Sequence, residues 1–375
     1  MFRKRMRFRN ISFLKEFLKR VRFMKRFLRG AFFLLLTQPA FAQDAHFSQF
    51  YETATLRNPA LVGVFSGDYK VGVVHRNQWS NMGTPFVTTN LAAESRIMIL
   101  KETNDFLSFG INAQLDKAGS VNFSTNTFYG AVNYNKSLGR DQSTFLSVGL
   151  AGGYIQRSVD VSKMRFSSQY SNGTFDQNNS ASVAAISGNV VQHFDMGAGV
   201  SLNGSMGQRV NYYAGVAGYH LSRPQETYLS QEVANLHTRW TGNAGVSVAF
   251  NNTLSMILHA NYQWQDPNSE FVAGGLLRGT FGTTSIDNPT KKMALAAGCF
   301  YRHGDAIIPT VRLEFSKLAV TGSYDVPVTS NRIYTTGMNA FEISLFFRGN
   351  WPKRPDNPMA CPRFEGLLMD EPKFD

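Results

Sequence analysis

The sequence predicts an all-β protein, a transmembrane antiparallel β-barrel of about fourteen strands. Three observations predict it: an N-terminal export signal, alternation of apolar and polar residues along nearly the whole remaining chain, and the lack of any apolar run near the ~18 residues of a membrane helix. Backbone groups in lipid have to bond to one another, so alternating strands in a membrane must close into a barrel.

Residues 1–42 are predicted to be a secretory signal peptide, cleaved between Ala42 and Gln43. The first 29 residues contain twelve Lys and Arg and one acid, and they are followed by an apolar run and a small-residue site over 40–42. Taking these twelve bases from 38 and this acid from 26 leaves a net charge of about +1. The exported chain is therefore almost neutral, which argues against a nucleic-acid binder.

The long basic stretch before the apolar run has two readings. Apolar residues recur in it at near-helical spacing from Phe13 to Leu28, as in an amphipathic helix at a membrane surface. Alternatively, the natural start is Met24, which gives a signal peptide of ordinary length. Residue 43 is glutamine and not cysteine, so no lipid anchor is expected on the exported protein.

The barrel is predicted over residues 68–347. The alternation is clearest in 253–264, where one face is apolar throughout and the other is mostly polar, and it recurs in 240–250, 306–316 and 341–347. Strand starts are predicted near residues 68, 86, 105, 122, 143, 192, 208, 238, 253, 268, 292, 305, 317 and 334.

Aromatic spacing distinguishes this pattern from that of a soluble sandwich. Trp240 and Phe250 are ten residues apart on one apolar face, as are Tyr69 and Trp79. Ten residues at ~3.3 Å each, tilted by ~40°, rise about 25 Å, which is the height of the apolar band between the aromatic girdles of a membrane barrel.

An even strand count puts both ends of the barrel in the periplasm and makes alternate connections share a side. If the first connection (80–85) is extracellular, the two longest ones, about 156–191 and 223–237, are extracellular too. Tight turns such as Met206-Gly207 and Asn251-Asn252 then fall in the periplasm, as is normal in barrels. The stretch 281–291 is too long for this pattern and leaves the strand count there open.

Residues 43–67 are predicted to form an N-terminal segment in the periplasm or in the barrel lumen. Proline restricts the backbone at Asn58-Pro59-Ala60 to a turn. Together with the nearby aromatic residues Phe47, Phe50 and Tyr51, this turn could plug the lumen.

Residues 348–375 are predicted to be a periplasmic tail, because they are rich in proline and charge. The tail is either a docking element or an extended end. It contains Cys361, one of only two cysteines, and a bridge from Cys361 to Cys299 is left open by the sequence.

Charged residues lie on the predicted lumen faces of strands from both ends of the chain. Arg76 and Glu94 are expected near the outer mouth. Closure of the barrel then brings them to the strands that carry the remaining charges, as one ladder with Arg312, Glu314, Asp325 and Glu342. Such charges either satisfy one another in a polar lumen or line a path for a polar solute.

Short motifs near both ends of the chain resemble those of one known family. They are Gln43–Phe50, Asn58-Pro59-Ala60 with Gly63, and Arg76-Asn77-Gln78-Trp79, then Asp305–Pro309, Gly322–Val326, Phe341–Leu345 and Cys361–Phe364. In this order they resemble the PorP/SprF family of the type IX secretion system of Bacteroidota. The resemblance assigns a structural or partner-related role to His46, Phe47, Gln49, Phe50, Asn58, Pro59, Ala60, Arg76, Asn77, Gln78, Trp79, Asp305, Pro309, Tyr324, Asp325 and Glu342.

What the resemblance implies is an integral protein of the cell outer membrane that belongs to the secretion and gliding machinery. It would support export or surface attachment of a large adhesin with a C-terminal sorting domain. Its partners would be that adhesin or periplasmic lipoproteins of the machine, besides outer-membrane lipid. The alternative is a passive or hydrophobic-solute transporter of the fatty-acid-transporter type, in which an inward segment near Asn58-Pro59-Ala60 also plugs the lumen.

No catalytic, cofactor or metal site is predicted. Asp44 and His46 flank the mature N-terminus and the other histidines are scattered, without a nucleophile elbow, a zinc-binding pair or paired carboxylates. We therefore expect a protein that is not an enzyme.

Overall fold

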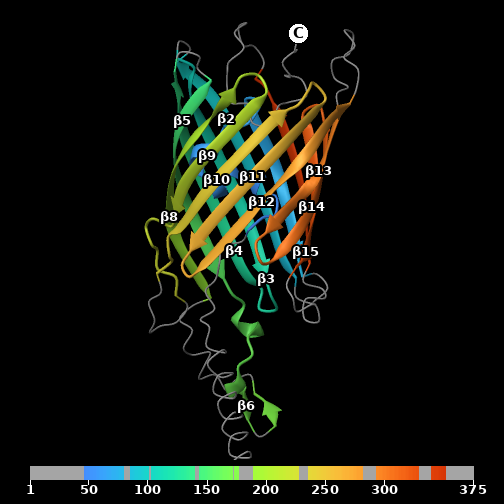
Figure 1. Ribbon diagram of the computed structural model, residues 1–375. Helices are drawn as coiled ribbons and strands as arrows, with labels where there is room; N and C mark the ends of the chain where they lie inside the picture. The colour runs from blue at the N-terminus through green and yellow to red at the C-terminus, as the bar shows by residue number, and fades with distance from the viewer. Residues whose placement is uncertain are drawn as a thin grey trace, which may run out of the picture. The chain divides into compact units, whose positions relative to one another are not determined.

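The computed structural model describes residues 46–79, 85–100, 103–139, 143–171, 173–176, 189–227, 235–281, 293–328 and 339–351. Within them, fourteen strands form one closed antiparallel barrel (Figure 1). They are β1 (Tyr69–Gln78), β2 (Phe86–Leu100), β3 (Asp105–Ala118), β4 (Phe123–Leu138), β5 (Thr144–Ser158), β8 (Val190–Met206), β9 (Val210–Tyr219), β10 (Arg239–Ala249), β11 (Leu254–Gln265), β12 (Asn268–Phe281), β13 (Met293–Arg302), β14 (Ala306–Phe315), β15 (Leu318–Pro327) and β16 (Ala340–Gly349).

The predicted fold class and strand count are confirmed. Every predicted start except the last lies within two residues of the observed one, and the last strand begins at Ala340 rather than near 334. β12 pairs directly with β13, so the two strands that flank the long stretch 281–291 are neighbours in the barrel, and residues 282–292 lie outside the described residues. The barrel closes where β1 pairs with β16, in one register from Tyr69–Gly349 to Gln78–Ala340.

Strand order places the connections as predicted. Because successive strands alternate in direction, 79–85 leaves the same end of the barrel as 159–189 and 220–238, whereas β1 begins and β16 ends at the other end. The connection after β5 contains the 3-10 helices η4 (Val161–Lys163) and η5 (Ser167–Gln169). It also contains a two-stranded hairpin of β6 (Tyr170–Ser171) and β7 (Thr174–Phe175). By the usual arrangement of bacterial barrels, the end that carries the longest connections is the outer end.

The two faces of each strand differ as the alternation predicts. On β11, Leu254, Leu258 and Trp264 are exposed on the outside, whereas Ile257 and His259 are buried on the inside. The outer face is therefore an apolar surface suited to lipid, and the polar residues point into the lumen.

Three short helices precede the barrel: η1 (Phe50–Glu52), α2 (Ala54–Arg57) and η2 (Pro59–Leu61). In the described ranges, no helix is both long and apolar enough to cross a membrane. The predicted signal peptide, its cleavage site between Ala42 and Gln43, and residues 352–375 of the predicted tail, with Cys361, lie outside the described residues.

Candidate functional site

Most buried polar contacts that join distant parts of the chain involve residues 46–68, which we call the lumen segment. Apart from Leu56 and Val64, every residue from Phe47 to Asp68 is buried. The segment contacts strands from β1 to β16, so it is surrounded by the barrel wall. This placement fits the predicted position of the segment in the lumen.

Side chains of the barrel wall satisfy the backbone of the lumen segment. A buried backbone carbonyl without a partner costs about 1–3 kcal/mol, so an irregular segment needs donors around it. Asn133 donates to the carbonyls of Ala60 and Val62 at 3.0 and 2.8 Å, and Ser201 donates to the Ala60 carbonyl at 2.9 Å. The carbonyls of Leu56, Arg57 and Phe65 accept in the same way from Arg239, Thr241 and Arg96. The polar side chains of the lumen wall thus supply the hydrogen-bond donors that the irregular lumen segment needs.

The start of the segment is held by ion pairs in the outer half of the barrel, which we call the outer cluster. The backbone amides of Ser48 and Gln49 donate to the two carboxylate oxygens of Glu342, each at 2.8 Å. Arg76 lies 3.2 Å from that carboxylate and 2.9 Å from Asp325. Arg302 also contacts Asp325 at 2.9 Å, and the Ser48 hydroxyl bonds to Asp325 and to both arginines. Two cations therefore face two carboxylates across the seam where the barrel closes.

His46 extends the outer cluster. Its Nδ1 lies 3.6 Å from Oε2 of Glu270, and Glu270 lies 3.3 Å from Arg302. Burial, together with the positive charges of Arg302 and Arg76, holds the pKa of the His46 imidazole well below its ordinary value. The imidazole is therefore neutral at neutral pH, and its contact with Glu270 is polar rather than ionic.

Deeper in the lumen, one carboxylate of the segment is surrounded by three cations, which we call the inner cluster. Glu52 is fully buried and contacts Lys70 at 3.1 Å, Arg312 at 3.2 Å and Arg348 at 3.5 Å. Lys70 also donates to the backbone carbonyl of Glu52 at 3.0 Å. The inner cluster joins the segment to β1, β14 and β16.

The Asn58-Pro59-Ala60 turn packs on three wall glycines, Gly149, Gly199 and Gly215, which we call the glycine platform. The Asn58 side chain accepts from the Ala60 amide and donates to Asn243, both at 2.9 Å. A Cβ atom at Gly149 would lie 2.3 Å from the Pro59 carbonyl carbon, and one at Gly199 or Gly215 would lie 2.2 or 2.7 Å from the Asn58 side chain. Only glycine leaves room for the turn at these positions.

Aromatic side chains fill the lumen between the two clusters. The Tyr51 ring stacks on His259 at 4.7 Å and on Phe300 at 5.3 Å, and Phe50 meets Phe300 edge to face at 5.9 Å. The segment therefore occupies this part of the lumen with close packing as well as with charge pairs.

The structure brings only part of the predicted site residues together. His46, Phe47, Gln49, Phe50, Asn58, Pro59, Ala60, Arg76, Asp325 and Glu342 belong to the lumen segment or contact it. Asn77, Gln78 and Trp79 lie at the outer end of β1, and Asp305 lies in the turn after β13. Pro309 and Tyr324 point outward. A role of these residues in partner binding stays a prediction.

The predicted single ladder of charges is wrong, because the charges form two separate clusters. Glu94 pairs across the strands with Lys70, not with Arg76, and so lies toward the inner end rather than at the outer mouth. Arg312 and Glu314 lie deeper than Asp325 and Glu342, and Arg312 pairs with Glu52. The residues that the sequence interpretation missed are Glu52, Ser48, Glu270, Arg302, Arg348 and Asn133.

Comparison with known proteins identifies a family. The model of the type IX secretion system membrane protein PorP/SprF family matches residues 40–347. No curated protein matches the chain.

Solved structures similar to the chain include three barrels of low identity. The toluene transporter TbuX of Ralstonia pickettii is 12% identical, with 79% of this chain and 93% of that chain covered and a TM-score of 0.46. The toluene transporter TodX of Pseudomonas putida is 9% identical, with 78% and 92% covered and a TM-score of 0.45. A FadL homologue of Pseudomonas aeruginosa is 10% identical, with 79% and 93% covered and a TM-score of 0.43.

The family match spans the lumen segment and the barrel from β1 to residue 347, two residues before the end of β16. The closed barrel has the apolar outer face that an integral protein of the outer membrane requires. The chain therefore belongs to the type IX secretion system membrane protein PorP/SprF family and is an integral outer-membrane β-barrel.

Proposed function

We propose that this barrel supports export or surface attachment of a large adhesin by binding other proteins at its two ends, and that it neither conducts solutes nor catalyses a reaction. The partners would be periplasmic lipoproteins of the secretion machinery or the adhesin itself. The proposal rests first on the family.

The observation that supports a function through protein contacts, and not through solute transport, is the occupied lumen. Apart from Leu56, the segment from Phe47 to Leu61 is buried, and charge pairs on both the outer and the inner side hold it to the wall. A solute would have to displace these pairs, and breaking a buried pair costs about 3–5 kcal/mol. The surfaces left for function are then the turns and connections at the two ends.

Photo-crosslinking in cells tests this proposal and shows which end binds. A photoreactive residue is placed at exposed positions of the inner turns, namely Gln208, Asn252 and Lys317. It is also placed in the outer connections, at Arg223 and His303. Leu258, which faces lipid in the middle of β11, is the control position. We expect adducts with secretion-system proteins from at least one end and none from Leu258.

The same strains report function. In a deletion strain we expect loss of secretion or of surface display of the adhesin, restored by the intact barrel. If no crosslinking position at either end gave an adduct with another protein, and the deletion strain secreted and displayed the adhesin normally, the proposal would be refuted. Swelling of liposomes that contain the purified intact barrel would support solute transport instead.

A further inference from the structure

Arg57 is a buried cation without a carboxylate partner in the described part of the chain. Its side chain donates to the Tyr213 hydroxyl at 2.8 Å and lies 5.2 Å from the Tyr213 ring and 5.8 Å from the Phe50 ring. Arg57 is 7% exposed, and its Nε has no hydrogen-bond partner among the described residues. A buried charge is normally compensated by an opposite charge, so the guanidinium calls for an anion.

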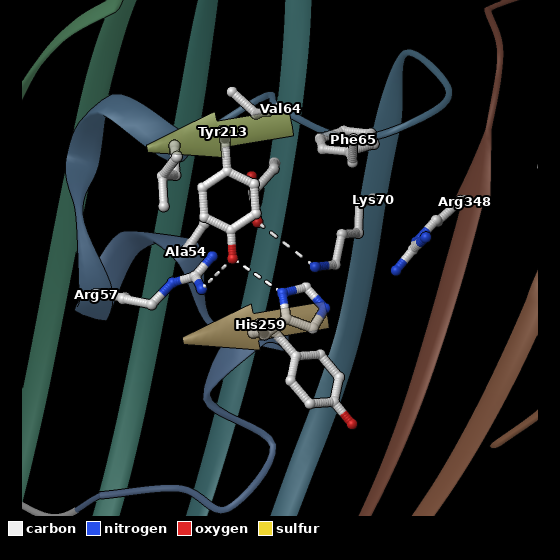
Figure 2. Close-up of a pocket in the computed structure, with 11 residues that line it drawn as sticks. Ala54, Arg57, Val64, Phe65, Lys70, Tyr213, His259 and Arg348 are labelled. Carbon is white, nitrogen blue, oxygen red and sulfur yellow. Dashed lines mark hydrogen bonds and ion pairs between the residues drawn. The ribbon is translucent and has the colours of Figure 1, made fainter. Parts of the chain in front are cut away.

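Arg57 lines a small cavity between the lumen segment and the wall (Figure 2). The cavity has a volume of about 30 Å³, and Lys70, Glu94, Tyr213, His259 and Arg348 also line it. One water needs about 10–15 Å³ measured in this way. The space therefore admits a monatomic ion or a few waters, and it excludes a lipid headgroup or a sugar, since pockets for such ligands measure ~300 Å³ or more.

The lining of this cavity carries more positive than negative charge. Arg57, Lys70 and Arg348 face Glu94 as the lining carboxylate. Glu52 contacts Lys70 and Arg348, but it is shared with Arg312.

His259 also lines the cavity and is joined to Arg57 through Tyr213. Arginine can only donate, so the Tyr213 hydroxyl accepts from Arg57, and the same hydroxyl lies 2.9 Å from Nδ1 of His259. Figure 2 shows this chain of bonds from Arg57 through Tyr213 to His259.

We propose that this cavity is a halide site, in which one chloride ion serves as the counter-ion of Arg57 and fixes the lumen segment to the wall. Chloride meets both requirements, a single negative charge and a size close to that of water. The site is independent of the secretion role, because it concerns how the segment is held and not what the ends of the barrel bind.

Chloride dependence of stability tests the site. The full barrel is refolded in detergent in chloride or in gluconate at equal ionic strength, and the unfolding midpoint is read from heat-dependent gel mobility. We expect a saturable rise of about 2–4 °C in chloride. Crystals soaked in bromide should show an anomalous peak beside the Arg57 guanidinium.

Two variants separate the halide from general packing. Arg57→Met should abolish the chloride dependence. Arg239→Met is the matched control, because Arg239 is also buried, donates to the Leu56 carbonyl at 3.0 Å and lies 4.8 Å from the Tyr219 ring, but does not line the cavity. It should lower the midpoint and keep the chloride dependence.

Equal midpoints of the wild-type barrel in both salts, without a bromide peak, would show that the cavity holds only water and would overturn the proposal. Chloride dependence that persists in Arg57→Met would overturn it as well. If Arg57→Met does not fold, the wild-type salt comparison and the bromide peak decide.

Discussion

Replacing Glu52 with glutamine is expected to lower the free energy of unfolding of the barrel by about 3–5 kcal/mol. The substitution removes one negative charge that Lys70, Arg312 and Arg348 share in a fully buried position. The three cations then repel one another without a central counter-charge. A urea titration of the folded barrel in detergent, followed by tryptophan fluorescence, measures the loss.

Lys136→Gln is the control for Glu52→Gln. Lys136 also makes a short ion pair, 2.8 Å from Asp105, but its side chain is 47% exposed. Solvent screens such a pair, so its loss should leave the unfolding midpoint almost unchanged. Similar losses in the two variants would contradict the central role assigned to Glu52.

The strands could be predicted from the sequence because their signal is local. Alternation along 254–265 or 306–315 records which face meets lipid, and it needs no knowledge of distant residues. Strand direction then follows from strand order, which is why the connections that share one end of the barrel were predicted correctly. The start of β16 was misplaced because 334–339 offers no clear alternation before Ala340.

Depth within the lumen was harder to predict, since it depends on where each hairpin turns. Arg76 lies two residues before the outer end of β1, whereas Glu94 lies eight residues after the start of β2 and meets Lys70 near the inner end. Counting residues from the turn would have separated the two charges. The prediction placed Arg76 and Glu94 together because it used only the face of the strand on which they lie and not their distance from the turn.

Glu52 was missed because its partners lie far away in the chain. Lys70, Arg312 and Arg348 reach it only after the barrel closes and the segment folds inside. A signal was nevertheless present, since Glu52 is the only acid between His46 and Gly67. A lone carboxylate in a segment expected inside a lumen points to a buried partner, although not to which one.

Gly149→Ala is expected to displace the Asn58-Pro59-Ala60 turn and to lower the free energy of unfolding by about 1–3 kcal/mol. The added Cβ would lie 2.3 Å from the Pro59 carbonyl carbon, which is backbone and cannot rotate away. Moving the turn lengthens the bonds that Asn133 and Ser201 make to the Ala60 carbonyl. Hydrogen exchange measured by mass spectrometry should then show faster exchange in peptides that cover residues 54–64.

Gly152→Ala is the matched control, three residues further along the same strand. Gly152 faces outward, and a Cβ atom there would meet no other atom within 4 Å. Its unfolding midpoint and its exchange over residues 54–64 should equal those of the wild type. If Gly149→Ala left exchange in this peptide as slow as Gly152→Ala does, the turn would not rest on the glycine platform. The occupied lumen, and with it the protein-contact mechanism, would then lose its main structural support.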